Sequence, residues 1–455
     1  MVKDMTSGSP MRLILAFAMP LLLGNILQQT YSLIDAAIVG QYLGMNALAG
    51  IGASSSVLFM ILGFCNGLTG GFGIPIAQAF GAQDYRSVRS YVRHSYLLSV
   101  LLSCLLAALC CRFCSDILRL MKTPQQIFPH ANVYLYITFA TIPFNLGFNL
   151  FASILRALGD SRTPFALLLL STVLNILLDL LFILLCGWGV AGAALATALA
   201  QFLCILVFIH IVRHRFPILH AQGERLQFRL RQIGRLLAMG VPMGLQFSIT
   251  AIGSIMLQSA NNALGTVCAT AFTTGLRIKM FCMCPFENLG VAMATYCGQN
   301  LGASRLHATV AATYLLRIRQ GVKSAIILML LYCAFIVTVL QLFSYDLSLL
   351  FVYAYETEIL QKSEQFLRFT SMFYPALGLL CILRYSLQGL GYTSLSMFSG
   401  VSEMFARIAA SLFIVPALGF MGICIGDPLA WISAVCFLVP TFLIVYRRLY
   451  RIPAR

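Results

Sequence analysis

The sequence predicts an all-α polytopic membrane protein with twelve transmembrane helices in two pseudo-symmetric lobes of six. Of its 455 residues, 60% are hydrophobic and only 10% are charged, and the mean hydropathy is +0.89. A soluble chain of this length carries about a quarter charged residues. Long stretches contain no Asp, Glu, Lys, Arg or His, namely residues 13–34, 36–83, 131–155, 236–276, 324–345 and 428–446.

The lengths of these stretches predict the number of helices. A bilayer core about 30 Å thick needs roughly 20 apolar residues per helix. The two longest stretches, 36–83 and 236–276, therefore each contain a helix, a glycine-rich turn and a second helix. Dividing the chain at its charged residues and Gly/Pro breaks predicts spans at 12–40, 46–80, 90–113, 130–156, 163–186, 190–213, 233–264, 267–301, 318–344, 359–388, 393–416 and 420–446.

The basic residues indicate how these helices are oriented. With a cytoplasmic N-terminus, the cytoplasmic segments hold most of the arginines, among them Arg86, Arg89, Arg93, Arg156, Arg162, Arg213, Arg229, Arg235, Arg317, Arg319, Arg447 and Arg448. This asymmetry is the positive-inside bias of membrane proteins. It accounts for the net charge of +16 without a nucleic-acid partner. We expect a multi-pass protein of the cell inner (plasma) membrane with both termini in the cytoplasm.

The two halves of the sequence repeat each other weakly. Pro20 and Pro242 each open a long apolar run. Three further pairs of segments follow in the same order, offset by about 220 to 232 positions. They are "AQAFGAQD" (77–84) with "GQNLGASR" (298–305), "LRALGDSRTP" (155–164) with "LQGLGYTSLS" (387–396), and "GVAGAALATALA" (189–200) with "GFMGICIGDPLA" (419–430).

Six spans per half is an even number, so both halves enter the membrane in the same orientation. Repeats of this kind are related by an axis along the membrane normal, and the substrate route runs between them. We expect an N-lobe at 1–213, a cytoplasmic connecting segment at 214–232 and a C-lobe at 233–455. This organisation is typical of a transporter and disfavours a channel.

Two acidic residues lie inside spans of the first half without a basic residue at comparable depth. They are Asp35 and Asp179. An ionisable group near the bilayer centre costs a few kcal/mol and is therefore a functional candidate. Burial without a cationic partner favours the protonated carboxyl group, so these residues could exchange H⁺ or Na⁺.

Further polar residues occur at helical spacing around these acids. Gln28, Tyr31 and Asp35 share one face of the first helix, and Asn175 and Asp179 share a face of the fifth. Asn145, Asn149 and Thr197 lie within the fourth and sixth spans. These residues could form one wet pocket in the N-lobe. The alternative is that Asn, Gln and Thr only form hydrogen bonds between helices.

The second half has a different charge pattern. Its acids are Glu287, Glu403 and Asp427, and basic residues Arg277, Lys279, Arg384 and Arg407 lie in the same or neighbouring spans. Glu403 and Arg407 are four apart, which favours an ion pair on one helix. Position 35 corresponds to Met256 or Leu257, so the lone acid has no copy in this half.

The order and spacing of several motifs resemble the multidrug and toxic compound extrusion (MATE) transporters of the MOP superfamily, and in particular their prokaryotic DinF-like branch. The resemblance covers the whole chain and rests on Pro20, "YSLIDAAIVGQYLG" (31–44), "QAFGAQD" (78–84), "ILRALGDSRTP" (154–164), "NILLD" (175–179) and "GVAGAALAT" (189–197).

This resemblance implies an efflux antiporter that exchanges cationic or amphipathic drugs for H⁺ or Na⁺. It assigns cation coupling to Asp35, Asp179, Asn175 and Thr197, places Tyr31 beside the coupling acid, and makes Pro20 a bending point of the first helix. Acids found in the seventh and tenth helices of the NorM-like branch are missing here: those regions read "PMGLQFSITA" (242–251) and "FYPALGLLCI" (373–382). A sodium site of that kind in the C-lobe is therefore not expected.

For the substrate-binding residues we expect Tyr31, Gln28, Asn145, Asn149 and Met19, with Phe17 as a further apolar wall. The partners are then the lipid bilayer and small drug-like cations, and the protein is a monomer without cofactor or bound metal other than a coupling Na⁺. A lipid-linked oligosaccharide or lipid flippase of the same superfamily is the alternative. An enzyme is not expected, because the spans contain no nucleophile–base or metal-binding motif.

Overall fold

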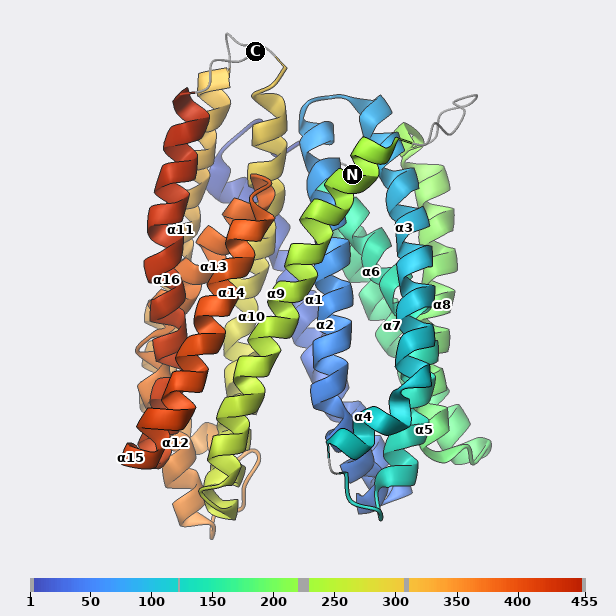
Figure 1. Cartoon of the computed structure of the whole chain (residues 1–455), viewed down its shortest axis with the longest axis vertical. Coiled ribbons are helices and arrows are strands. Elements are labelled where there is room, and N and C mark those ends of the chain that lie inside the picture. The colour runs from blue at the N-terminus through green and yellow to red at the C-terminus, as the bar shows by residue number, and fades with distance from the viewer. Residues whose placement is uncertain (1–3, 122, 220–228, 307–310, 452–455) are drawn as a thin grey trace. The chain divides into compact units, whose positions relative to one another are not determined.

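The twelve expected spans are present in a computed structural model of the chain, of which residues 4–121, 123–219, 229–306 and 311–451 are described (Figure 1). Ten helices are long and apolar enough to cross a membrane, and two further pairs of shorter helices each form one bent span. The connecting segment expected at 214–232 lies partly outside the described residues.

The first half contains α1 (Pro10–Leu43), α2 (Met45–Gly81), α3 (Tyr85–Arg112), α4 (Cys114–Leu120), α5 (Phe128–Ala140), α6 (Ile142–Ala157), α7 (Arg162–Leu180), the π-helical segment η1 (Leu181–Leu185), α8 (Gly189–Arg215) and the short 3₁₀ turn η2 (Pro217–Leu219). The second half contains α9 (Leu230–Asn262), α10 (Thr266–Ala303), α11 (Ala311–Ser348), α12 (Thr357–Ser371), α13 (Tyr374–Gly389), α14 (Thr393–Ala409), the π-helical η4 (Ala410–Ile414), α15 (Val415–Leu418) and α16 (Phe420–Arg451).

The fourth and tenth spans are bent, which was not predicted from the sequence. The axes of α5 and α6 differ by 50°, and those of α12 and α13 by 52°. Pro143 and Pro375 stand in the first turn of the second helix of each pair, where proline cannot continue the hydrogen bonds of the preceding helix. Thr141, at the first bend, also donates its hydroxyl to Ile137 O at 2.9 Å, a contact that favours bending.

Backbone conformation confirms the duplication in detail. Gly44 and Gly265 join the first two helices of each half with φ of 85° and 99°. Gly159 and Gly391 lie two residues after the last residues of α6 and α13, with φ of 84° and 89°. The residue after each glycine donates to a carbonyl five positions earlier, Asp160 N to Leu155 O and Tyr392 N to Leu387 O. This is the glycine-terminated helix end that left-handed glycines permit.

The chain divides into two compact units that differ from the expected lobes at two helices. Unit 1 contains Leu23–Gly244, and unit 2 contains Asp4–Leu22 together with the chain from Leu245 onward. Each boundary falls inside a long helix, two residues after Pro20 in α1 and two residues after Pro242 in α9. The expected boundaries, 1–213 and 233–455, had instead assigned each helix to one lobe.

The first part of α9 packs into unit 1 through small residues on two helices. Gly67 and Gly71 of α2 face Gly240 and Gly244 of α9, and both pairs have four-residue spacing. A Cβ atom at Gly67 would lie 2.4 Å from Met243 O, so the backbones are in direct contact. Helices in membranes associate at such small-residue pairs because close approach increases van der Waals contact.

The segment before α1 is held in unit 2 by buried amides. Gln299 Oε1 accepts from Met5 N at 3.0 Å, and Asn300 Nδ2 donates to Met5 O at 3.2 Å. In unit 1 the equivalent Gln78 accepts from Arg235 Nη2 of α9 at 2.6 Å. The same glutamine position in each repeat thus bonds to the segment that opens the other repeat, which is the start of α9 for Gln78 and the residues before α1 for Gln299.

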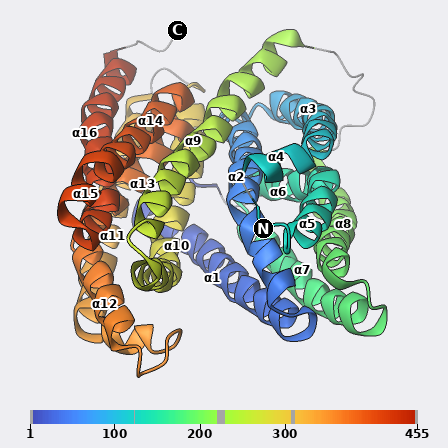
Figure 2. The ribbon, with the colours of Figure 1, turned by 60° about the horizontal axis from the view of Figure 1, so that its bottom comes forward.

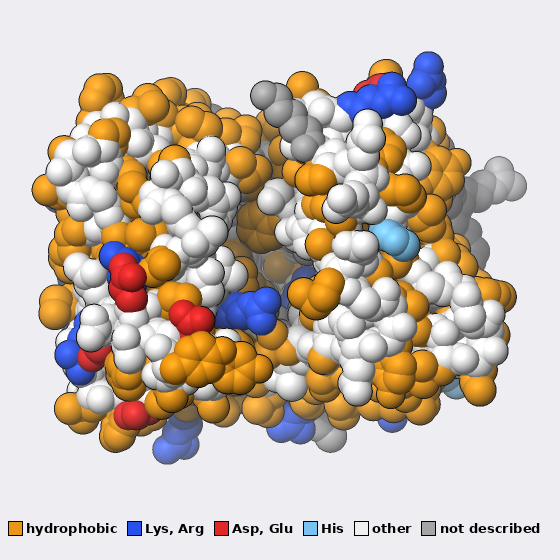
Figure 3. Space-filling view, turned by 90° about the horizontal axis from the view of Figure 1, so that it is seen from below, with side chains coloured by type: hydrophobic (Ala, Val, Ile, Leu, Met, Phe, Trp, Pro, Cys, Tyr) orange, Lys and Arg blue, Asp and Glu red, His pale blue; other side chains and the backbone are white. Residues whose placement is uncertain are grey.

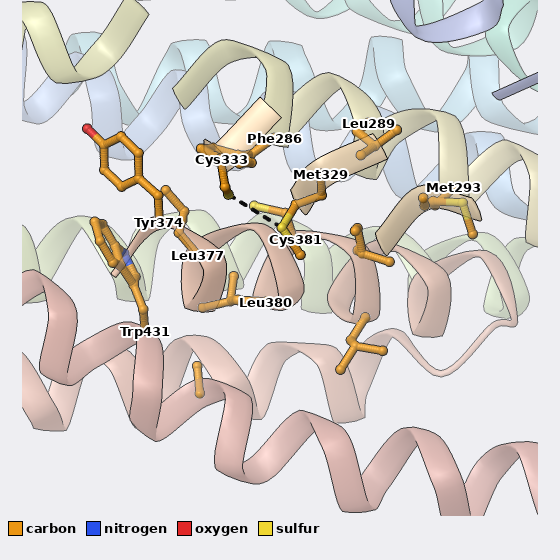
Figure 4. Close-up of a cluster of buried hydrophobic side chains, with 14 of the residues drawn as sticks. Phe286, Leu289, Met293, Met329, Cys333, Tyr374, Leu377, Leu380, Cys381 and Trp431 are labelled. Carbon is orange, nitrogen blue, oxygen red and sulfur yellow. Dashed lines mark hydrogen bonds between the residues drawn. The ribbon is translucent and has the colours of Figure 1, made fainter. Parts of the chain in front are cut away.

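Each unit has its own apolar core. In unit 2 the rings of Phe286, Tyr374 and Trp431 are neighbours, with centroid distances of 5.8 and 6.1 Å (Figure 4). In unit 1, α7 and α8 run side by side and are joined near Gly187 and Gly189 (Figure 2). The packing of α1 and α5 against this helix pair places the polar residues described next.

Candidate functional site

Five of the residues expected to couple ions or bind substrate meet inside unit 1. Tyr31 and Asp35 come from α1, Asn175 and Asp179 from α7, and Thr197 from α8. Asn175 Nδ2 donates to Thr197 Oγ1 at 3.3 Å, and the Tyr31 hydroxyl lies within hydrogen-bonding reach of Thr197. We call these five residues, with Tyr134, the acidic site.

Asp35 and Asp179 are the charged centre of the acidic site. Their carboxyl groups lie within hydrogen-bonding reach of each other, although they come from α1 and α7. Asp179 is fully buried and Asn175 is 3% exposed. Two ionised carboxylates can only repel each other, so this contact becomes a hydrogen bond when one of them carries a proton.

Four oxygens of the acidic site lack hydrogen-bond donors among the described residues. Asp35 Oδ1, Asn175 Oδ1 and both carboxylate oxygens of Asp179 are buried without a hydrogen-bond partner among the described residues. Neither carboxyl group forms an ion pair with a lysine, arginine or histidine in the described part of the chain. Since buried acceptors are normally satisfied, this set of oxygens fits a proton or a hard cation such as Na⁺.

Tyr134 of α5 is a member of the acidic site that was not predicted from the sequence. Its side chain interacts electrostatically with Asp35 and Asp179, and also with Tyr31. The only sequence signal was a tyrosine inside an apolar span. This signal did not indicate which face of the helix the tyrosine occupies, because α5 is one half of a bent span that was not predicted.

The backbone next to Asp179 is irregular. Asp179 is the second-last residue of α7, directly before the helix widens into the π-helical segment η1. Gly192 packs against the backbone of Phe182 in η1, since a Cβ atom at position 192 would lie only 3.2 Å from the Phe182 carbonyl carbon. A π-helical turn changes the direction of the following side chains and occurs frequently beside functional residues.

Five other expected residues have no contact with the acidic site among the described residues. Asn149 Nδ2 donates to Asn145 O at 2.9 Å, and neither residue has a contact with the acidic site among the described residues. Gln28 is exposed on α1, and Met19, 44% exposed, belongs to unit 2. Phe17 is 1% exposed within the core of unit 2, so its expected place on a binding wall is wrong.

Unit 2 contains a chain of buried ion pairs that we call the ionic network. Lys279 Nζ pairs with Asp427 Oδ2, and Arg407 Nε donates to Asp427 Oδ1 at 2.9 Å. Arg407 Nη1 lies 3.5 Å from Glu403 Oε2, as the four-residue spacing predicted. Arg384 pairs with the other oxygen of Glu403. Arg277 is outside the network and lies over the ring of Phe351.

The ionic network and the acidic site occupy equivalent places in the two repeats. With the offsets of the sequence anchors, Asn175 corresponds to Arg407 and Thr197 to Asp427. Where unit 1 has a neutral hydrogen bond between α7 and α8, unit 2 therefore has an ion pair between α14 and α16. Within the described residues, no group of three or more His, Cys, Asp or Glu side chains could hold a metal ion.

Comparisons with known proteins agree with this architecture. A profile of the MatE family matches residues 20–181 and again 242–413, which together are more than half of the chain. The probable multidrug resistance protein YpnP of Bacillus subtilis is 32% identical over 300 residues, covering 66% of this chain and 67% of YpnP. The probable multidrug resistance protein YoeA of the same organism is 27% identical over 443 residues, covering 95% and 93%.

Solved structures show the same fold. An outward-facing multidrug resistance MATE family transporter of the MOP superfamily aligns with a TM-score of 0.89 and 22% sequence identity over 98% of each chain. The two profile matches begin at Pro20 and Pro242, the prolines that open the two repeats. The chain therefore belongs to the MatE family, whose members are membrane transporters and not enzymes.

Proposed function

We propose that the protein is a multidrug efflux antiporter that exports cationic or amphipathic compounds in exchange for H⁺ or Na⁺. The observation that carries this proposal is the pair of carboxyl groups in unit 1, Asp35 and Asp179, which touch each other without a basic partner among the described residues. Such a pair attracts one positive charge at a time, and a proton and a drug cation would compete for it.

The exchange cycle follows from this competition. In the state open to the cytoplasm, the ionised carboxyl pair binds a lipophilic cation, and Tyr31 and Tyr134 offer aromatic faces to it. After reorientation, protonation of Asp35 from outside removes the attraction and the cation leaves. One pH unit corresponds to about 1.4 kcal/mol, or tenfold accumulation for one-for-one exchange.

The relatives support drugs as the substrate class, since YpnP and YoeA are both named as probable multidrug resistance proteins.

The distribution of basic residues supports the orientation with cytoplasmic termini. Met5 and Tyr446 lie at the same end of unit 2, through contacts of Met5 with Asn300, Asn300 with Arg317, and Tyr446 with Leu315. This end carries Arg317, Arg319, Arg447 and Arg448, and from the positive-inside rule we infer that it lies in the cytoplasm.

The opposite end fits the same orientation. On the face of each unit that Figure 3 shows, hydrophobic and uncharged atoms cover most of the surface, and charged side chains form only small patches. Asp346 lies near the end of α11, Glu356 directly before α12 and Glu358 in the first turn of α12. We infer that this face lies outside the cell.

Na⁺ is the second candidate ion. The oxygens of Asp35, Asn175, Asp179 and Thr197 are the hard ligands that Na⁺ prefers. The flippase remains the alternative function because unit 2 buries three cations that could face a pyrophosphate. However, each of Lys279, Arg384 and Arg407 already has a carboxylate partner.

Transport of ethidium, a fluorescent cation, in proteoliposomes with separately imposed pH and Na⁺ gradients tests the proposal. We expect accumulation driven by the pH gradient, or by the Na⁺ gradient if Na⁺ is the coupling ion. Liposomes with protein whose Asp346, exposed at the end of α11, is replaced by Asn serve as the charge-matched control. No accumulation under either gradient would contradict antiport and favour the flippase.

A further inference from the structure

The ionic network of unit 2 has an excess of one positive charge. It contains three cations, Lys279, Arg384 and Arg407, but only two acids, Glu403 and Asp427. All five side chains are at least 89% buried. An unbalanced charge in a low-dielectric interior is unfavourable, so a further negative group is required nearby.

Glu287 of α10 is the candidate for this negative group, although no ion pair within 4.0 Å joins it to the network among the described residues. Its electrostatic partner is Arg384, at the end of the network. Unlike the five members of the network, Glu287 is exposed, although it lies at the middle of a membrane-spanning helix. Protons and ligands can therefore reach the carboxylate of Glu287, the candidate for balancing the charge of the network.

A polar stripe on α10 leads to Glu287. The exposed residues of α10 are separated by three, four or seven positions, so they lie on one face of the helix. After Glu287 the helix is covered, since none of residues 288–303 is exposed. The exposed residues are Thr266, Thr270, Thr273, Arg277, Met280 and Glu287. A face in contact with lipid tails would be apolar. This composition indicates a water-accessible track that ends at Glu287.

Arg384 has one nitrogen left to bind a ligand at the end of this track. Its Nε donates to Ser399 Oγ at 3.0 Å and its Nη2 pairs with Glu403, whereas Nη1 takes part in neither contact. In unit 1 the position equivalent to Glu287 is Asn66, which is exposed but uncharged. The charged track is thus specific to unit 2.

We propose that unit 2 binds the anionic group of an amphipathic molecule, a carboxylate or a sulfonate, at Arg384 when Glu287 takes up a proton. The bound anion replaces the charge of Glu287, so the network stays balanced with one proton and one monoanion bound together. This site is separate from cation exchange in unit 1, and it would let the transporter accept zwitterionic as well as cationic compounds.

Few other groups can titrate in contact with Glu287. Its neighbours are Arg384 and Cys381 on α13 and Cys284 on its own helix. On α11, Tyr332 interacts with Cys282, Cys284 and Cys333, and Glu287 is not among its partners. The charged residues of α12 form pairs within their own helix, Glu358 with Lys362 and Glu364 with Arg368.

Binding of radiolabelled taurocholate, an amphipathic monosulfonate that stays ionised, to the full chain in nanodiscs tests this site. Because proton and anion bind together, we expect the Kd of the unaltered protein to fall by up to tenfold for each pH unit of acidification. Glu287→Gln mimics the protonated carboxyl group and should bind at every pH with the low-pH Kd. Glu287 is exposed, so this substitution leaves the packed core intact.

Two control variants separate this site from other effects. Glu358→Gln removes a carboxylate that is 70% exposed and should keep the pH profile of the unaltered protein. Asp35→Asn, which tests cation exchange in unit 1, should also keep it. A Kd that does not change with pH, or a Glu287→Gln variant that retains the pH dependence, would overturn the proposal. Taurocholate binding at no pH would overturn it as well, whatever the result of cation transport.

Discussion

Replacing Asp35 by Asn is expected to abolish gradient-driven export while the protein still folds. The amide has nearly the shape of the carboxyl group, but it carries no charge and does not take up a proton. Asp35 Oδ1 has no hydrogen-bond donor among the described residues, so the substitution leaves no buried partner unsatisfied. Coupled accumulation of ethidium should fall at least tenfold, towards the level of protein-free liposomes.

Two measurements accompany this variant. In the unaltered protein, protons and cations compete for the carboxyl pair, so the Kd for a cation should rise by up to tenfold for each pH unit of acidification. This dependence should be weaker in Asp35→Asn. Asp346→Asn, with the same loss of charge at an exposed position, should transport and bind as the unaltered protein does. Full export by Asp35→Asn would exclude Asp35 as a coupling residue.

Replacing Asp427 by Asn is expected to destabilise unit 2 by about 3–5 kcal/mol, the usual effect of breaking a buried ion pair from one side. Asp427 pairs with both Lys279 and Arg407, and its side chain is 7% exposed. Its loss leaves three cations facing only Glu403 and Glu287. Thermal unfolding in detergent, followed by the loss of monodisperse protein, should show a midpoint several degrees lower.

A double substitution distinguishes charge imbalance from loss of packing. In Asp427→Asn with Lys279→Met, two cations, Arg384 and Arg407, face two acids, Glu403 and Glu287. We expect this variant to recover most of the lost stability, because the network is again balanced. If it unfolds at the same temperature as Asp427→Asn alone, the balance of charge is not what stabilises the network.

The sequence predicted the twelve spans closely because apolar length and charge breaks determine membrane helices directly. For example, the span expected at 46–80 is α2 at 45–81. It did not predict the bends, since Pro143 and Pro375 lie inside uninterrupted apolar runs. Nor did it predict that α1 and α9 are divided between the units after Pro20 and Pro242. That division depends on packing between distant segments, such as Gly67 against Gly244.

The centre of the candidate site was also predictable, because an unpaired acid in a membrane span is conspicuous. Helical spacing placed Tyr31 with Asp35 and Asn175 with Asp179, and the structure brings both pairs together with Thr197. Spacing could not show that Asn145 and Asn149 bond to each other, since any two amides four apart on a helix have that option. Tyr134 was missed because a tyrosine is common in apolar spans.

The two repeats show how one backbone supports two chemistries. The contact between Asn175 and Thr197 has its counterpart in the contact between Arg407 and Asp427. In unit 1 the helices carry unpaired carboxyl groups that can exchange ions. In unit 2 the same positions form buried ion pairs, and the exchange that we propose there is at the exposed Glu287. On the basis of this asymmetry we propose that cation coupling occurs in unit 1.

Proton release on drug binding tests this assignment most directly. Tetraphenylphosphonium would be added to the purified protein in weakly buffered, Na⁺-free solution, and the released protons measured with a pH dye. Competition at the Asp35–Asp179 pair predicts release approaching about one proton per bound cation, and little release from Asp35→Asn. Cation binding without proton release across the pH range, in the absence of Na⁺, would contradict proton exchange at this site.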